Sequence, residues 1–269
     1  MGPLGFSTCC FPVRQTIRES LSFAMSHGFQ AVELEVNESN FDPTRTEPSL
    51  VEWIGGIAAA GSLRLGVHSP GNVNFSDLRA VHRATGEALV MDSIRLAAQL
   101  GAKTVVVHPG RVVGEDGPQK VRESWEQNVS AIRRCAELAR QEGVVVSVEN
   151  LCHESNSVNP EIASFLAMCR EIGLQLIGLT LDTNHAALVD GLAESTSVIG
   201  PYVDTIHFSS NRGQKSDHCE PDEGVIDFST ITEFLRGFDG TTIIELNETG
   251  VESAAALLRT RAYLEHLLS

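Results

Sequence analysis

The sequence lacks the features of a membrane or exported protein. No segment approaches the roughly 18 uninterrupted apolar residues that a membrane helix needs, and the N-terminal MGPLGFSTCC has no basic run leading into an apolar stretch. Cysteine is also scarce, because the six cysteines form no CxxC pair and are too few for a disulfide scaffold in 269 residues. We therefore expect a cytoplasmic protein that does not interact with a membrane.

Nucleotide-binding loops and excess positive charge are missing as well. The sequence contains neither a GxxxxGKS/T loop nor a GxGxxG motif after a strand. Acidic residues outnumber basic ones by 35 to 20, for a net charge of −15, and such a surface repels polyanions. This balance argues against a nucleic-acid partner, although a local basic cleft within an acidic surface remains an open alternative.

Short β-rich runs alternate with segments of helical periodicity along the whole chain. The helical segments carry apolar residues at helical spacing, as at Ile17, Leu21 and Ala24. Glycines occupy the joint between a helical segment and the next run, as helix C-caps do, at positions 28, 61, 101, 143 and 173. There are eight β-rich runs, at 5–10, 31–36, 63–69, 104–110, 144–150, 177–182, 204–210 and 241–247. Eight such units predict an α/β fold, a single (β/α)8 TIM barrel domain over residues 1–269.

Four of these runs end on, or close to, a side chain that binds metals: Glu149, Asp182, His207 and Glu245. The carboxyl ends of the strands in a closed parallel barrel meet at one mouth, so these four side chains are expected to converge on one divalent cation. Two ring nitrogens with several carboxylates suit Mn²⁺, Co²⁺ or Zn²⁺, and a site with three carboxylates and one imidazole also tolerates Mg²⁺. For each carboxylate taken alone, a helix N-cap or a turn residue is an equal alternative.

Four further histidines are candidate additional metal ligands. His68 and His108 come at the ends of the third and fourth runs, His185 lies three residues after Asp182, and His218 lies in the long loop 209–225. The alternative for His68 and His108 is a histidine that orients a loop through hydrogen bonds. For His185 and His218 the alternative is contact with substrate.

Two other pairs of residues, in the second and first runs, are also candidates for functional roles. Glu33 and Glu35 alternate with apolar residues in the second run, so both are expected on one side of that strand. One of them is a candidate for a polar group in the barrel interior or for a partner that orients a metal ligand. Cys9 and Cys10 end the first run, where a thiol nucleophile is less favoured than a small core residue.

Six motifs resemble the xylose isomerase-like TIM-barrel superfamily over essentially the whole chain. They are HSP at 68–70, HPG at 108–110, VEN at 148–150, LDTNH at 181–185, the segment from HFSSNRG to DHCEPDEGVID at 207–227, and IIELN at 243–247. This superfamily contains sugar and sugar-phosphate isomerases, ketose 3-epimerases, inosose dehydratases and metal-dependent abasic-site endonucleases.

The isomerase and epimerase branch implies one divalent metal, bound by the four strand-end residues named above. It also implies substrate contacts from His185 and Arg212, and His68 and His108 are further candidates for such contacts. If the substrate is an α-hydroxycarbonyl compound, Glu149 and Glu245 on opposite sides of the metal are expected to act as base and acid.

The endonuclease branch implies three zinc ions instead, with additional ligands at His68, His108, His185 and His218. That branch expects an aspartate two residues before the loop histidine, whereas this chain has Ser216 there and Asp217 one place later. This departure affects the third metal position and leaves the first intact.

The resulting prediction is a metal-dependent isomerase or epimerase of a sugar, sugar phosphate or related polyol, with a small carbohydrate-like substrate. The alternative is a multinuclear zinc phosphodiesterase resembling abasic-site endonucleases, and a third class is a silent barrel that only binds a sugar or a partner. Arg111, Arg212 and Lys215 could each hold a substrate phosphate or be solvated loop charges, so phosphorylation stays open. Whether the chain forms a homo-oligomer also stays open.

Overall fold

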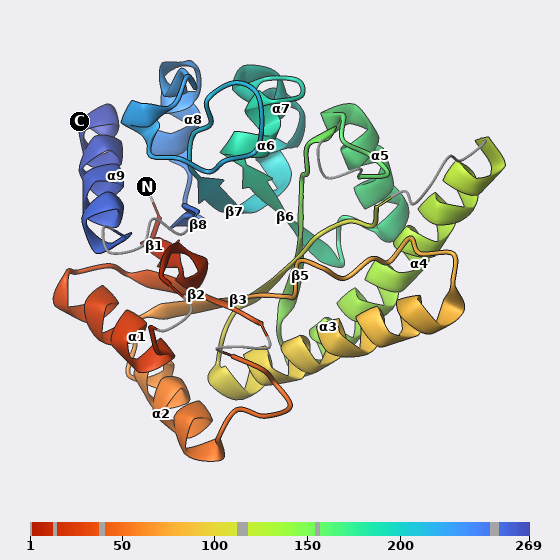
Figure 1. Cartoon of the computed structure of the whole chain (residues 1–269), viewed down its shortest axis with the longest axis horizontal. Helices are drawn as coiled ribbons and strands as arrows, with labels where there is room; N and C mark the ends of the chain where they lie inside the picture. The colour runs from red at the N-terminus through yellow and green to blue at the C-terminus, as the bar shows by residue number, and fades with distance from the viewer. Residues whose placement is uncertain (1, 13–14, 38–40, 112–117, 154–156, 248–252) are drawn as a thin grey trace.

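A computed structural model of the chain describes residues 2–12, 15–37, 41–111, 118–153, 157–247 and 253–269. Every neighbouring pair of strands is parallel, and β8 pairs with β1, so the sheet closes into a barrel in simple sequence order. The predicted TIM barrel is thereby confirmed (Figure 1). The strands are β1 (Leu4–Ser7), β2 (Ala31–Glu35), β3 (Arg64–His68), β4 (Thr104–Val107), β5 (Val145–Glu149), β6 (Ile177–Asp182), β7 (Val203–Phe208) and β8 (Thr241–Ile244).

Helices surround the barrel in Figure 1, and the long α3 and α4 lie side by side. Within the described residues, every helix is too short or too polar to cross a lipid bilayer. The helices are α1 (Ile17–Ser26), α2 (Pro48–Ala59), α3 (Ala80–Leu100), α4 (Pro118–Glu142), α5 (Ile162–Ile172), α6 (Thr183–Ala187), α7 (Leu192–Ile199), α8 (Thr232–Gly237) and α9 (Ser253–Leu268).

The helix ends follow the predicted glycine pattern. Gly101 caps α3 in the left-handed region, with φ 69° and ψ 18°, and its N–H bonds to the carbonyls of the last helical turn. Residues with a Cβ adopt this conformation at a cost, which explains why glycine occupies the joint. The glycines at the other predicted joints also have positive φ, at positions 28, 61, 143 and 173.

The first predicted run is shorter as a strand than expected, and this corrects the position given to the two cysteines. Strand β1 ends at Ser7, and Thr8–Cys10 forms the short 3₁₀ helix η1. The Ser7 side chain accepts a hydrogen bond from the Cys9 N–H, which turns the backbone out of the sheet. Cys9 and Cys10 therefore lie in a turn beyond the strand rather than at its end.

The two faces of the strands have different compositions. On β5, Val146 and Val148 face outward and belong to the apolar core beneath the helices. On the inward face of the same strand, Ser147 bonds to Thr180 of β6 at 2.7 Å, and Glu149 points the same way as Ser147. The barrel interior is therefore rich in polar side chains, and the apolar core lies between barrel and helices.

Candidate metal centre

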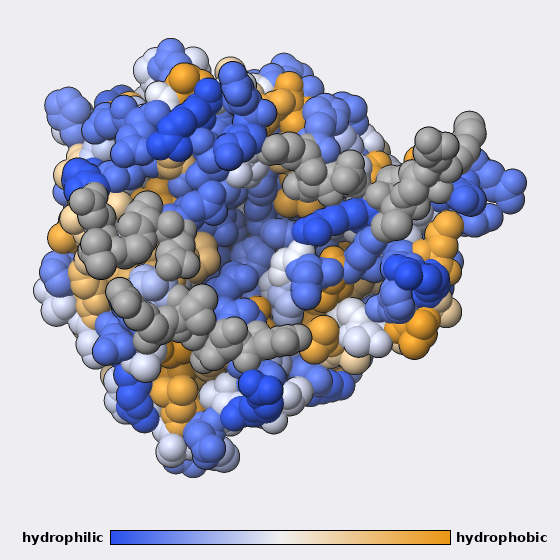
Figure 2. All heavy atoms as spheres, viewed as in Figure 1, coloured by the Kyte–Doolittle hydropathy of each residue, from blue (hydrophilic) through white to orange (hydrophobic). Residues whose placement is uncertain are grey.

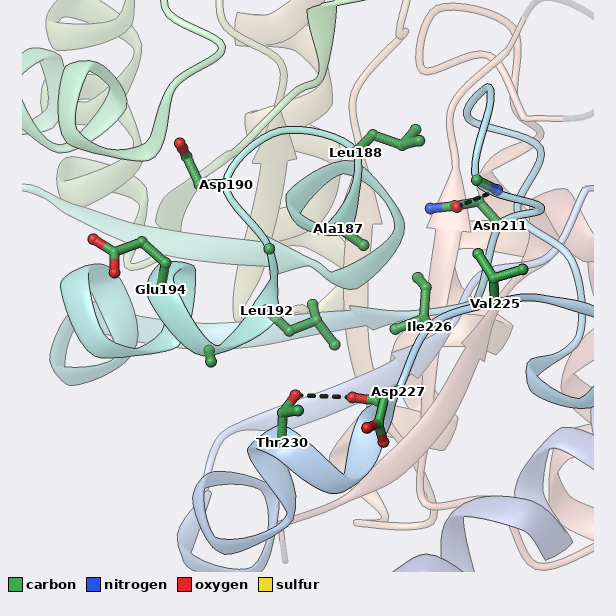
Figure 3. A pocket seen from close by; sticks show the side chains of 13 residues that line it. Ala187, Leu188, Asp190, Leu192, Glu194, Asn211, Val225, Ile226, Asp227 and Thr230 are labelled. Atoms are coloured by element: carbon green, nitrogen blue, oxygen red, sulfur yellow. Dashed lines mark hydrogen bonds between the residues drawn. The ribbon is translucent and has the colours of Figure 1, made fainter.

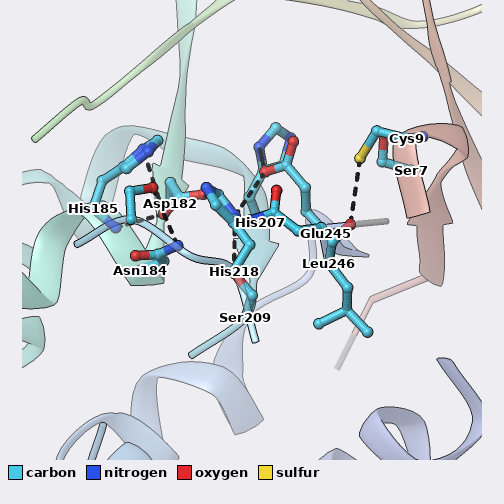
Figure 4. Close-up of polar contacts among 12 residues, drawn as sticks. Ser7, Cys9, Asp182, Asn184, His185, His207, Ser209, His218, Glu245 and Leu246 are labelled. Atoms are coloured by element: carbon cyan, nitrogen blue, oxygen red, sulfur yellow. Dashed lines mark hydrogen bonds and ion pairs between the residues drawn. The ribbon is translucent and has the colours of Figure 1, made fainter. Parts of the chain in front are cut away.

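The carboxyl ends of four strands bring the predicted ligands together. Glu149 and Asp182 are the last residues of β5 and β6, His207 lies near the end of β7, and Glu245 directly follows β8. Each of these residues offers one ligand atom, and the four atoms lie within 4.8 Å of one another. Figure 4 shows Asp182, His207 and Glu245 pointing into the same space. The convergence expected from strand order is present.

The cluster contains buried polar atoms without hydrogen-bond partners. Asp182 Oδ2, His207 Nδ1 and Glu245 Oε2 are all shielded from solvent and make no hydrogen bond in the described structure. His207 Nδ1 lies 3.0 Å from Glu245 Oε2 and 3.5 Å from Glu149 Oε2. Leaving such atoms unpaired is costly, and a cation between them would satisfy all of them at once. The donor set, three carboxylates and one imidazole, therefore fits a divalent metal.

Asp182 is a helix N-cap and a candidate ligand at the same time. Its Oδ1 accepts a hydrogen bond of 2.6 Å from the His185 N–H and so caps α6. The Asn150 side chain holds the Asp182 backbone, accepting from its N–H at 2.8 Å and donating to its carbonyl at 3.2 Å. The capping role uses one carboxylate oxygen and leaves Oδ2 directed at the cluster. Asn150 was missed in the sequence, where its only signal is an amide directly after a strand-end carboxylate.

Three of the additional histidines contact Glu149. His68 Nε2 and His108 Nε2 lie 3.3 and 3.2 Å from its Oε2, and His185 Nδ1 lies 3.3 Å from its Oε1. Among the further groups whose ligand atoms lie within 4.8 Å of one another are His68 with His108 and Glu149, and Asp182 with His185 and His218. The mouth can thus accommodate more than one cation by geometry.

His218 adopts an unusual backbone conformation. Its φ is 40°, and it is the one residue other than glycine with positive φ in the part of the chain that the structure describes. Such a conformation costs on the order of 1–3 kcal/mol and persists only where the surroundings fix it. Here the neighbouring Cys219 pairs with Ser210 across the loop, and His218 Nδ1 lies 3.1 Å from Ser209 Oγ. In this conformation His218 Nδ1 lies 3.8 Å from Glu245 Oε2 and 3.9 Å from Asp182 Oδ2.

The charged groups of the cluster shift one another's pKa values. Burial acts to raise the pKa of the Glu149 carboxyl, but the surrounding histidines outweigh it and hold that pKa well below its ordinary value. The pKa of Glu245 is lowered in the same way, since His207 overcomes the effect of burial. At Asp182 burial prevails and raises the pKa. Burial acts to lower the pKa of His207, yet the carboxylates around it raise it well above its usual range.

Arg212, a predicted substrate contact, pairs with two carboxylates of the loop after β7. Its side chain is 54% exposed, and its guanidinium pairs with Asp217 at 2.8 Å and Glu223 at 2.5 Å. Cys9 Sγ lies 3.9 Å from the carbonyl oxygen of Leu246, the residue after Glu245 (Figure 4). The substrate contact of Arg212 stays a prediction, because its guanidinium is paired with Asp217 and Glu223 in this structure.

The barrel mouth and a second cavity differ in chemistry. Figure 2 shows a central hollow lined by hydrophilic residues. A separate cavity of about 480 Å³ lies beside α6 and α7, lined by apolar side chains such as Leu188 and Ile226 together with a few polar ones (Figure 3). Several polar groups there are already engaged, as Asn211 donates to Asn184 and Asp227 accepts from the Ser229 N–H. Histidines and carboxylates converge at the mouth, so the mouth is the candidate functional site.

A closed parallel barrel with buried carboxylates and imidazoles at its mouth defines a TIM barrel with a candidate divalent-metal centre. The chain belongs to the xylose isomerase-like TIM barrel family, whose model matches residues 21–265.

Three known proteins are similar to this chain. A D-tagatose 3-epimerase-like protein superimposes with a TM-score of 0.84 at 23% identity, over 99% of this chain and 97% of that one. The IOLI protein with a bound zinc atom has a TM-score of 0.84 at 17% identity, over 99% and 98%. Probable endonuclease 4 of Mycobacterium ulcerans (strain Agy99) is 26% identical over 211 residues, which is 75% of this chain and 80% of the relative. The two structures share the fold, and the relative shows that endonuclease-like sequences are also similar.

Proposed function

We propose that this protein is a divalent-metal-dependent isomerase or epimerase of a sugar, sugar phosphate or related polyol. The observation that carries the proposal is the buried set of Glu149, Asp182, His207 and Glu245, in which three ligand atoms make no hydrogen bond. Sugar epimerases are among the proteins with the same fold, which agrees with this assignment.

In this proposal the four residues hold one Mn²⁺, Co²⁺, Zn²⁺ or Mg²⁺. When bound, such a cation supplies Lewis-acid stabilisation of the negative charge that develops on a substrate oxygen as a C–H proton leaves. Glu149 and Glu245 then accept and return that proton. The neighbouring histidines lower the pKa of both carboxyls, so the group that accepts the proton is ionised, and the group that donates one must first take up a proton.

The product depends on how the two glutamates share the proton transfer. If Glu149 and Glu245 act on opposite faces of the same carbon, the product is an epimer. If one carboxyl returns the proton to the neighbouring carbon, the product is an isomer. Each positioned proton transfer contributes roughly 10²- to 10⁴-fold to the rate.

A cavity next to the cluster supports a polyhydroxylated substrate. It has a volume of about 540 Å³ and begins at Glu35, whose carboxylate lies 3.5 Å from His68. Its lining includes Asn37, Thr44 and Asn72, whose side chains suit hydroxyl groups. The volume exceeds what a single divalent ion needs and accommodates a small carbohydrate.

The test is solvent exchange during turnover. The metal-loaded enzyme is incubated in D₂O with a panel of ketoses, aldoses and their phosphates, and we expect deuterium at the epimerised or isomerised carbon of the accepted sugar. Glu149→Gln and Glu245→Gln should each lower the rate by about 10²- to 10⁴-fold while the fold persists. An accepted substrate whose conversion survives either change would refute the acid and base roles.

A second candidate function is a multinuclear phosphodiesterase. The two additional ligand groups, at His68 with His108 and at His185 with His218, favour it, as does the similarity to probable endonuclease 4. Counting metals in protein purified without chelator separates the two functions. One ion per chain supports the isomerase or epimerase, and two or three support the hydrolase.

A further inference from the structure

We infer that Glu33 is a positioning residue, which fixes the tautomer and the orientation of His207 so that Nδ1 faces the cation. Glu33 lies on the inward face of β2, on a strand that contributes none of the four proposed ligands. This inference rests on the proposed metal centre. It adds Glu33 to that centre, and the effect of Glu33 is measured as a change in metal affinity.

The geometry between the two side chains is specific. Glu33 Oε2 lies 3.2 Å from His207 Nε2, and both residues have 0% exposed surface. A carboxylate oxygen only accepts a hydrogen bond, so in the neutral imidazole that binds a metal Nε2 carries the hydrogen and Nδ1 has the lone pair. That Nδ1 is the nitrogen that faces Glu245 and Glu149.

A role for Glu33 as a ligand of the same cation conflicts with this arrangement. Glu33, His68, His207 and Glu245 do form a close group of potential ligands. However, the two nitrogens of one imidazole point in different directions, and Glu33 contacts Nε2 while the cluster contacts Nδ1. One cation therefore takes Nδ1, and Glu33 acts through the ring.

Hydrogen bonds of this kind usually matter for metal affinity. A carboxylate that accepts from the other ring nitrogen of a ligating histidine orients the ring and raises its basicity, and removing it costs about 10- to 100-fold in metal affinity. The Gln side chain in Glu33→Gln keeps the shape, but its amide group can donate to Nε2 and so stabilise the wrong tautomer.

Glu35 provides a matched control. It lies two residues further along β2 on the same inward face, and its carboxylate contacts His68 rather than His207. Glu35→Gln therefore changes a carboxyl on the same strand without touching the proposed contact, although burial raises the pKa of Glu35 to about 7 and so leaves it partly protonated at neutral pH. The loss of a nearby negative charge weakens binding of a cation in both variants, so the difference between them reports the contact with His207.

The experiment is a Co²⁺ titration of chelator-treated protein, followed by visible absorption and calorimetry. We expect Glu33→Gln to weaken the first Co²⁺ by about 10- to 100-fold, with a cooperative thermal transition retained in the metal-free state. Glu33→Asp keeps the charge on a shorter side chain and should fall between Glu33→Gln and the unchanged protein. Equal losses in Glu33→Gln and Glu35→Gln, or no loss in Glu33→Gln, would overturn the inference.

A spectroscopic readout separates positioning from a general structural role. In the Co²⁺ protein, the Nε2–H of a histidine bound through Nδ1 gives a hyperfine-shifted proton signal that disappears in D₂O. We expect this signal from His207, and we expect it to shift or vanish in Glu33→Gln while it persists in Glu35→Gln. A signal that is unchanged in Glu33→Gln would contradict the proposed contact between Glu33 and His207. These readouts need no substrate, so their failure is distinct from failure of the proposed reaction.

Discussion

The outward and inward faces of the barrel strands carry different kinds of side chain, although they alternate along the same few residues. On β2, Leu34 faces outward with 0% exposed surface and belongs to the apolar core, while its neighbours Glu33 and Glu35 face the interior. The outward face contributes hydrophobic stabilisation, and the inward face collects charge that is costly to bury unless it is paired or binds a metal. Residues on the outward face are thus expected to affect stability, and residues on the inward face are expected to affect metal binding. This difference can be tested by substitutions on each face.

The largest effect is expected from truncation on the outward face. Leu34→Ala should lower the free energy of unfolding by about 2–5 kcal/mol, because it leaves a cavity in a close-packed core. The measurement is denaturant unfolding, with Co²⁺ affinity of the folded protein as the second readout. We expect that affinity to be unchanged, and a strong loss of affinity would mean that the two faces are not separable.

Metal removal should act mainly on the inward face. A ligand present at 100 times its dissociation constant stabilises the native state by about 2.7 kcal/mol, so chelation should lower Tm accordingly. A similar Tm with and without chelator would show that no cation binds the folded state.

The buried histidine His185 makes the stability of the metal-free protein depend on pH. Burial acts to lower the pKa of His185, but Asp182 and Glu149 outweigh it and raise the pKa to about 10. An unfolded histidine has a pKa of about 6.5, so protonated His185 stabilises the metal-free fold fully below that pH and progressively less as pH rises toward 10. We expect the Tm of chelated protein to fall over this window while Co²⁺ affinity rises, since each cation displaces protons. A metal-free Tm that rises with pH over the same window would contradict these shifts.

A smaller effect is expected at Asn150, which supports the interior without being a proposed ligand. Asn150→Ala leaves the buried N–H of Asp182 without its side-chain partner, at a cost of about 1–3 kcal/mol in unfolding free energy. We also expect weaker Co²⁺ binding, because the Asp182 backbone loses two hydrogen bonds. Unchanged stability and affinity would show that Asn150 does not position Asp182.

The smallest effect is expected at Arg212, at the exposed rim. Arg212→Gln breaks its pairs with Asp217 and Glu223, and surface pairs of this kind contribute little. Tm and Co²⁺ affinity should stay the same. If the predicted substrate contact exists, KM for the accepted sugar should rise, and an unchanged KM would remove Arg212 from the site.

The sequence predicted the barrel and the convergence of its strand ends because both follow from local patterns. Runs of β-branched residues ending on Glu149, Asp182 and His207 need only the rule that parallel strands finish at one mouth. The glycine joints were predictable for the same reason, since a left-handed cap is a property of the local backbone.

The contacts across the barrel were not predictable from one sequence. Period-two alternation assigns Glu33 a face, but it does not say that β2 places this carboxylate against His207 on β7. The turn at Cys9 and the strained backbone of His218 likewise depend on loop packing, which a strand pattern does not encode. Arg212 is a long exposed side chain, so its partner is decided by neighbouring loop residues such as Asp217 and Glu223.

The central claim is that Glu149, Asp182, His207 and Glu245 hold a common divalent cation. Its most direct test is anomalous diffraction from crystals of chelated protein soaked in Mn²⁺ or Co²⁺. The account predicts a peak about 2.0–2.3 Å from one ligand atom of each of the four residues. A peak that lies only among His68, His108 and the surrounding loops, with these four side chains uncoordinated, would contradict it.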